Sequence, residues 1–316
     1  MWHWSHTNIC IKLKLHCFEV NVIQIIKYAL MLVLIKAQAV TKSGEVKMNK
    51  LFNSNLLKNA LLGSILLACS LPVFAEPDPK LWPVMKEAFF EKRPMQEVDF
   101  MRIDAPRRAE SGAQVPVTYI IDNAAAKGVK IVKLYAFVDA NPIPLTATYH
   151  LTDNLGNFNL STRIRFETDA FVRLVGEAED GKLYLASREI RAAGGCGGTV
   201  DGDEAQIRAS AGKIKFKVDE PVKMGSATST TFNIKHPMRT GLQRELVSQG
   251  FVPAFYIKKT EFTYNGKPLM TVDVGVGTAE DPYFKFDFVP NAPGKLGVVA
   301  TDNEGKTFTN EVEVKS

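Results

Sequence analysis

The feature that most constrains this fold is a series of short segments in which about every second residue is apolar. Residues 160–166, 214–218 and 283–288 all show this period of two. It is the period of a β-strand with one buried and one solvated face. Turn-forming residues separate such segments, and Asn265-Gly266 is a strong hairpin signal. Because no segment keeps a helical period for more than three turns, we expect an all-β protein built from antiparallel sandwiches.

A Gly- and Asp-rich segment, residues 194–205, interrupts this strand pattern. Its glycines favour a mobile connection, and a chain of 316 residues is long enough for two domains. We therefore expect one sandwich over residues 76–193 and a second over residues 206–316, joined by residues 194–205. A short helix is expected to start near Trp82 and to end by Glu91, because proline follows the tryptophan.

The first 75 residues have the pattern of a targeting leader. Basic residues follow Met48, an apolar run comes next, and Val73-Phe74-Ala75 is a small-residue cleavage signal. We expect Met48 to be the true start, so that residues 1–47 come from a start placed too early and residues 48–75 are a signal peptide. The mature protein should then begin at or near Glu76.

Two alternatives would tie the chain to a membrane. Residues 66–69 resemble a lipoprotein box, which would place a lipid on Cys69. Residues 20–37 are apolar enough to suggest an anchor, but Lys27 interrupts the run and it is short for an easy span. We expect cleavage of the leader instead, and no stable membrane association.

The charge distribution argues against a nucleic-acid partner. The whole chain carries a formal charge of +5. Residues 1–75 hold eight lysines, no arginine and two glutamates, so the remainder carries 31 basic and 32 acidic residues. A nearly neutral mature chain has no general attraction to nucleic acid or anionic lipid.

Cysteine usage points to one chemically special residue. Cys10, Cys17 and Cys69 all lie in the leader, so its removal leaves Cys196 alone. An unpaired cysteine in an exported protein indicates an intermolecular bond or a reactive thiol. No disulfide can form within one mature chain.

Four glycines flank Cys196, and we call residues 194–198 the arm. Glycines carry no side chain that could shield the sulfur, and they leave the backbone free to bend. We therefore expect an exposed thiol on a mobile arm, standing roughly 17 Å beyond Arg191 when extended, with further slack before a strand near Ile207. An exposed thiol in an oxidising compartment is a liability unless it is used, so we expect a small cargo bound covalently to Cys196. The arm glycines are Gly194, Gly195, Gly197 and Gly198.

The sequence lacks the motifs of a self-contained enzyme. It contains no nucleophile elbow, phosphate loop or dinucleotide fingerprint. After the leader the only histidines are His150 and His236, and neither has a neighbour at metal-ligand spacing. We interpret His236 as a strand-end residue and residues 201–204 as solvated linker. We expect a carrier without turnover of its own, with no metal or other cofactor.

The arm at the end of a β-sandwich resembles the swinging arm of SoxY, the sulfur-carrier subunit of periplasmic thiosulfate oxidation. The following half resembles SoxZ, the partner of SoxY, through residues 234–241, 253–257 and 264–267. The resemblance implies two immunoglobulin-like sandwiches that pack on each other in the periplasm. It also implies that Cys196 bears thiosulfate-derived intermediates for partner sulfur-oxidation enzymes, and that the SoxZ-like half is a scaffold without known chemistry.

This chain departs from the family in one respect, because the arm of SoxY is a free C-terminus and here the chain continues. Fused carriers of this kind resemble a subfamily associated with quinoprotein alcohol dehydrogenases. An unknown cargo serving a quinoprotein dehydrogenase and its cytochrome c is therefore one alternative. Another is a structural immunoglobulin-like protein that dimerises through a disulfide at Cys196. The fusion further predicts that cargo arrives at the tip of a loop, which requires partner enzymes with wide entrances.

Overall fold

A computed structural model of the chain describes residues 77–315, which belong to one compact unit. The expectations for the leader lie outside the described residues. These are the start at Met48, the cleavage near Glu76, the lipid on Cys69 and the anchor over residues 20–37.

The first half of the described chain is a sandwich preceded by one short helix. The helix begins and ends close to the predicted positions, and its aromatic residues pack on the sheet through Phe137. Gly181 takes a positive φ in the turn at residues 179–182. The elements are α3 (Leu81–Phe90), β1 (Met95–Glu97), β2 (Met101–Asp104), β3 (Val115–Ile121), β4 (Ile131–Val138), β5 (Leu145–Leu151), β6 (Asn159–Ile164), β7 (Ala170–Ala178) and β8 (Leu183–Ile190).

The second half repeats this style of short strands. Asn265 and Gly266 both take positive φ in the hairpin turn that the sequence predicted. The elements are β9 (Thr199–Val200), α4 (Glu204–Ala209), β10 (Ile214–Val218), β11 (Thr228–Ile234), β12 (Arg244–Glu245), β13 (Ile257–Tyr264), β14 (Lys267–Val274), β15 (Tyr283–Phe288), β16 (Gly294–Asp302) and β17 (Thr307–Val314).

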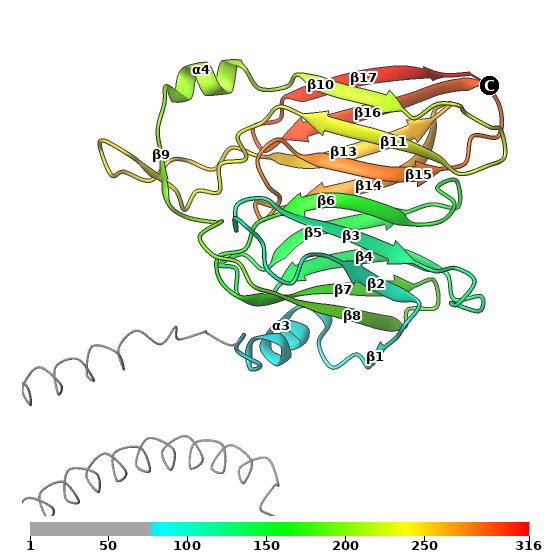
Figure 1. The fold of residues 1–316 in the computed structure, drawn as a ribbon, viewed down its shortest axis with the longest axis horizontal. Coiled ribbons are helices and arrows are strands. Elements are labelled where there is room, and N and C mark those ends of the chain that lie inside the picture. The colour runs from blue at the N-terminus through cyan, green and yellow to red at the C-terminus, as the bar shows by residue number, and fades with distance from the viewer. Residues whose placement is uncertain (1–76, 316) are drawn as a thin grey trace, which may run out of the picture. The chain divides into compact units, whose positions relative to one another are not determined.

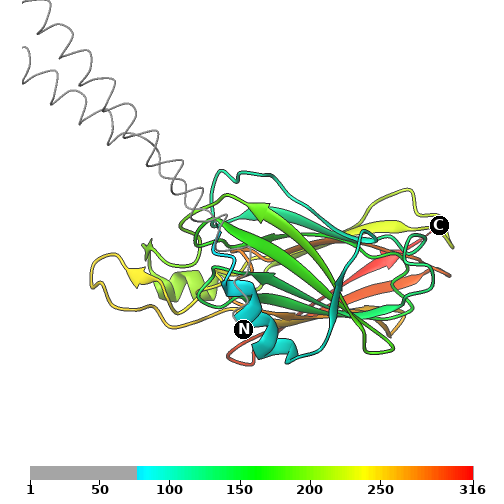
Figure 2. The same cartoon turned by 90° about the horizontal axis from the view of Figure 1, so that it is seen from below.

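The two immunoglobulin-like halves share both of their sheets. A nine-stranded sheet runs in the order β1-β8-β7-β4-β5-β14-β13-β16-β17, and a six-stranded sheet runs β10-β11-β15-β6-β3-β2. The strands of the two halves therefore lie side by side in one continuous array, and the sheets form two layers (Figures 1 and 2). One apolar cluster between the layers contains residues of both halves, such as Tyr149 and Phe286.

Three details differ from the sequence-based expectation. The halves are joined edge to edge through ladders β5–β14 and β6–β15 rather than as separate sandwiches. Two strand pairs, β1–β8 and β9–β12, are parallel, although antiparallel pairing was expected throughout. Ile207 lies in helix α4 instead of a strand, because Asp203 accepts hydrogen bonds from the amides of Ala205 and Gln206 and so caps a helix start.

The connection between the halves lies at one end of the sandwich. Strands β9 and β12 and helix α4 gather there, apart from the long strands (Figures 1 and 2). The arm immediately precedes β9, so the fold places Cys196 where the two halves and their connection meet.

Candidate functional site

The arm is docked along the edge of the first half by backbone hydrogen bonds. The amide of Gly194 donates to the carbonyl of Glu167, and the amide of Gly195 donates to the carbonyl of Phe166, both at 2.9 Å. Just upstream, the amide of Gly112 donates to the carbonyl of Ala193. The start of the arm therefore continues the strand-like pairing of the chain beyond β8.

Three of the four arm glycines are required by this docked geometry. Gly194 and Gly198 have φ values of 73° and 95°, which glycine adopts most easily. A Cβ on Gly195 would come within 2.0 Å of the carbonyl oxygen of Gly112. A Cβ on Gly197 would meet nothing closer than 3.9 Å. The glycines thus allow close docking as well as bending.

Cys196 is held from both halves of the molecule. Its amide donates to the Glu167 carboxylate at 2.9 Å, and its carbonyl accepts a hydrogen bond from the Thr240 hydroxyl at 2.9 Å. Only 5% of the residue is exposed. The expectation of an exposed thiol is therefore wrong for this structure, because residues distant in sequence provide the cover that the glycines cannot. That the arm is mobile remains a prediction.

Burial sets the protonation state of the docked thiol. Removal from water is the largest effect on the pKa of Cys196, and the negative charge of Glu167 adds to it. The positive charge of Arg165 acts in the opposite direction, and the pKa is raised to about 11. At neutral pH the docked thiol is therefore protonated and a poor nucleophile.

One buried amide fixes the segment that receives the arm. Asn141 donates from its side chain to the carbonyl of Arg165, and its side-chain oxygen accepts a hydrogen bond from the amide of Glu167. Asn141 is itself buried. The Glu167 carboxylate is thereby positioned under Cys196 by a satisfied internal hydrogen-bond pair.

The His-Pro-Met stretch after β11 forms the other side of the site. His236 is fully buried, its Nδ1 accepts a hydrogen bond from the amide of Met238, and burial lowers its pKa to about 4. Met238 takes a positive φ of 48°, and its carbonyl accepts a hydrogen bond from Arg165 at 2.6 Å. His236 is a strand-end residue, as expected, and it shapes the turn that presents Thr240 to the arm.

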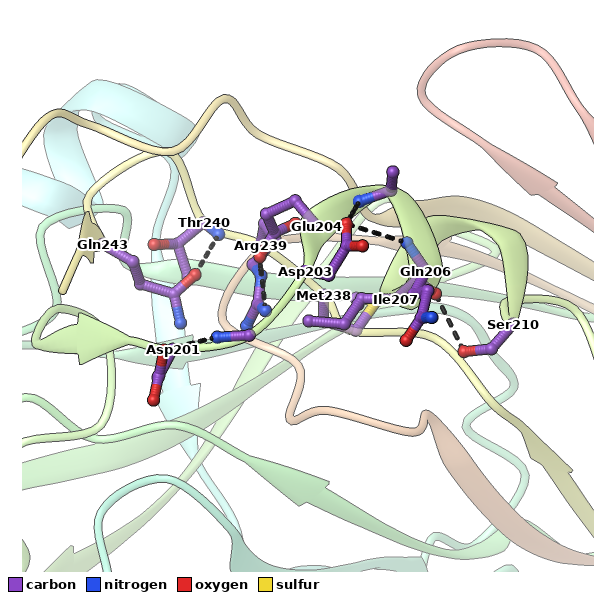
Figure 3. A network of polar contacts seen from close by, with 12 residues as sticks. Asp201, Asp203, Glu204, Gln206, Ile207, Ser210, Met238, Arg239, Thr240 and Gln243 are labelled. Atoms are coloured by element: carbon purple, nitrogen blue, oxygen red, sulfur yellow. Dashed lines mark hydrogen bonds and ion pairs between the residues drawn. The ribbon is translucent and has the colours of Figure 1, made fainter. Parts of the chain in front are cut away.

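The connection beyond the arm is tied to the second half. The amide of Arg244 donates to the carbonyl of Gly198, and β9 then pairs with β12. Figure 3 shows Arg239 reaching Glu204 at the start of α4, with contacts of 2.9 and 2.6 Å. Residues 201–204 are thus not simply solvated linker, because Asp203 caps a helix and Glu204 pairs with a buried arginine.

Sequence reasoning found Cys196 and its glycines but missed the residues that hold them. Thr240 and Arg239 lie inside the stretch that carried the family resemblance, so that stretch contained a signal for them. Glu167 and Arg165 follow an ordinary strand pattern, and no local signal marked them.

The described residues contain neither a metal-binding cluster nor a membrane-spanning helix. Within residues 77–315, no group of three or more His, Cys, Asp or Glu side chains is placed to hold a metal ion. In the same part of the chain, no helix is both long and apolar enough to cross a membrane.

Each half of the chain matches the model of a known protein family. Residues 86–196 match the family model of the sulfur oxidation protein SoxY, and residues 214–313 match that of the sulphur oxidation protein SoxZ. The fold, the arm and these two matches define a carrier-type component of sulfur oxidation. The chain is a fused SoxY–SoxZ-like protein, and the SoxY match ends at Cys196.

Two solved structures show partial likeness. The sulfur carrier protein SoxY from Chlorobium limicola f thiosulfatophilum is 29% identical, with 36% of this chain and 92% of that chain covered and a TM-score of 0.31. A superoxide reductase (neelaredoxin) from Ignicoccus hospitalis is 20% identical, with 37% of this chain and 93% of that chain covered and a TM-score of 0.26. No curated protein matches the chain.

Proposed function

We propose that this protein carries thiosulfate-derived sulfur intermediates covalently on Cys196 and presents them to partner oxidising enzymes, without turnover of its own. The observation that supports this most is the position of Cys196. The one free cysteine of the described chain ends the SoxY match and sits on a glycine arm held by both halves.

Loading requires the arm to leave its docked position. The docked thiol is buried and protonated, whereas an undocked thiol regains an ordinary pKa. Joining thiosulfate to Cys196 forms one sulfur–sulfur bond, releases the thiol proton and removes two electrons. An oxidising partner enzyme linked to a cytochrome would accept those electrons. The carrier contributes the thiol, the docked position that buries it and the undocking of the arm that exposes it.

The compartment and the partners are part of the proposal. Export through a signal peptide, with cleavage near Glu76, would place the carrier in the periplasm. Sulfur-oxidation enzymes are the first candidate partners, since both family matches belong to sulfur oxidation. A quinoprotein dehydrogenase and its cytochrome c are the second, since the arm continues into a second domain. The genes adjacent to this one would discriminate between them.

The test is intact mass spectrometry of the protein purified from its native host grown with thiosulfate. We expect a mature mass that begins near Glu76, plus an adduct of sulfur or sulfur–oxygen composition located on Cys196 by peptide mapping. Cys196→Ser should carry no adduct and should fail to restore thiosulfate oxidation in a deletion strain. An unmodified Cys196 in cells that consume thiosulfate, or a covalent dimer through Cys196, would overturn the proposal.

A further inference from the structure

Arg165 is a charged residue of the described chain that is buried without a carboxylate in contact. It lies directly after β6 and is only 3% exposed. Its Nη1 donates to the carbonyls of Met238 and Val276, at 2.6 and 3.3 Å. Across residues 77–315, no carboxylate lies within 4.0 Å of its guanidinium. Arginine is almost never this buried unless it is paired with a negative charge.

Two other arginines, the half-buried Arg173 and the buried Arg239, show what a paired guanidinium looks like in this fold. Arg173 donates from Nε to both oxygens of Asp139, at 3.0 and 2.8 Å. Arg239 contacts one oxygen of Glu204 with Nε and Nη2, at 2.9 and 2.6 Å. Neutral carbonyls stabilise a cation less than a carboxylate does. Among the described residues, Arg165 thus lacks the directly contacting carboxylate that Arg173 and Arg239 have.

The surroundings of Arg165 point to where that anion would come from. The next two residues, Phe166 and Glu167, receive the arm, and the carbonyl of Met238 that Arg165 contacts lies two residues before Thr240. The charge of Arg165 and the ionised form of Cys196 act on each other electrostatically. The negative charge of Glu280 raises the pKa of Arg165 less than ionised Cys196 does, and the positive charge of Arg239 lowers it. A negatively charged group attached to the Cys196 sulfur would enter the field of this guanidinium, which there acts against the negative charge of Glu167.

We propose that Arg165 is the counter-ion for an anionic cargo on Cys196, so that a cargo with a negative terminal group holds the loaded arm docked more firmly than a neutral one does. Arg165 is then a binding residue that selects cargo by charge. This inference rests on the proposed carrier function of Cys196. It adds a role for a residue of the SoxY-like half beyond the cysteine and its glycines.

The test compares two chemical adducts on the same cysteine. Cys10, Cys17 and Cys69 are replaced by Ser so that Cys196 alone reacts. Tetrathionate converts the thiolate to a thiosulfonate, R–S–S–SO₃⁻, and releases thiosulfate. Methyl methanethiosulfonate gives the neutral disulfide R–S–S–CH₃ and releases methanesulfinate. Both reactions run on the undocked arm at mildly alkaline pH, and mass spectrometry verifies each product.

The readout is hydrogen–deuterium exchange of the peptide that contains Gly194–Gly197, whose amides are bonded in the docked arm. The anionic adduct should slow exchange about tenfold relative to the neutral adduct, the size expected of one charge-assisted contact. Arg165→Gln should remove that difference. Arg163→Gln is the matched control, because it removes the same charge from an exposed position in β6, two residues before Arg165, and should leave the difference intact.

Several outcomes would overturn the inference. These are equal exchange for the two adducts in the unmutated chain, faster exchange for the anionic adduct, or a difference that survives in Arg165→Gln. If Arg165→Gln does not fold, Arg165→Lys takes its place and should retain part of the difference, since it keeps the charge but loses the fork geometry. Because the adducts are made chemically, this test can fail while cells still load Cys196, and it can succeed when they do not.

Discussion

The two halves of this molecule meet at two junctions that are built very differently. At the sheet junction, β5 pairs with β14 over five residue pairs, β6 pairs with β15, and a shared apolar core lies between the layers. At the arm junction, hydrogen bonds hold the arm: its amides donate to the carbonyls of Phe166 and Glu167 and to the Glu167 carboxylate, and the carbonyl of Cys196 accepts from the Thr240 hydroxyl. Cys196 belongs to neither apolar cluster of the described chain.

The difference teaches which contact is permanent and which can open. Apolar burial contributes about 25 cal/mol per Å², so a junction with many buried aromatic side chains is lasting. A neutral hydrogen bond contributes only about 1 kcal/mol net, and one to a charged group such as Glu167 about 1.5–3 kcal/mol. We therefore predict that the arm can leave and return while the halves stay joined, as the proposed carrier function requires.

The largest expected effect comes from the sheet junction. Phe286 is buried in β15 opposite Leu160 of β6, with its ring 4.8 Å from that of Phe262. Phe286→Ala should lower the free energy of unfolding by about 3–5 kcal/mol through the lost contacts and the cavity. Chemical denaturation measures it. Phe251→Ala, at a side chain that is 62% exposed, should change stability by less than about 0.5 kcal/mol. Similar losses in the free energy of unfolding for the two variants would contradict the view that apolar packing makes the sheet junction permanent.

A smaller effect is expected at the arm junction, and on a different observable. Gly195→Ala places a methyl group against the Gly112 carbonyl, so the arm should undock while the sheets stay folded. The alkylation rate of Cys196 by iodoacetamide should rise by roughly tenfold or more, the equivalent of losing one or two hydrogen bonds. Gly197→Ala has room for its methyl group and should keep the original rate. If both variants label alike, the docked arm does not control access to the thiol.

A further effect is a pH dependence of docking. The pKa of the Cys196 thiol rises from an ordinary value of 9.0 to about 11 in the docked arm. The docked state therefore holds its proton more tightly, so its stabilisation is fully present below pH 9 and is lost as pH rises toward 11, by up to ~1.4 kcal/mol per pH unit. The rate of trypsin cleavage next to the arm should rise between pH 9 and pH 11 more than it does in Cys196→Ala. Parallel profiles for the two proteins would contradict a buried neutral thiol.

The sequence by itself determined the local structure and the location of the site. Period-two segments became β6, β10 and β15, because alternation of side chains across a strand is a property of neighbouring residues. The Asn265-Gly266 turn followed from backbone preferences alone. Cys196 stood out because its flanking glycines have no ordinary packing role.

Only the tertiary structure decided how these parts meet. Whether β5 ends a sheet or pairs with β14 depends on two edges that are more than a hundred residues apart in sequence. Cys196 is buried because Glu167 and Thr240 approach it from different halves, which no local pattern encodes. In the sequence, Arg165 looks like an ordinary polar residue on the solvated face of a strand. Only the tertiary structure shows that it is buried without a contacting carboxylate among the described residues. Burial and charge pairing are properties of the environment, and long-range packing supplies that environment.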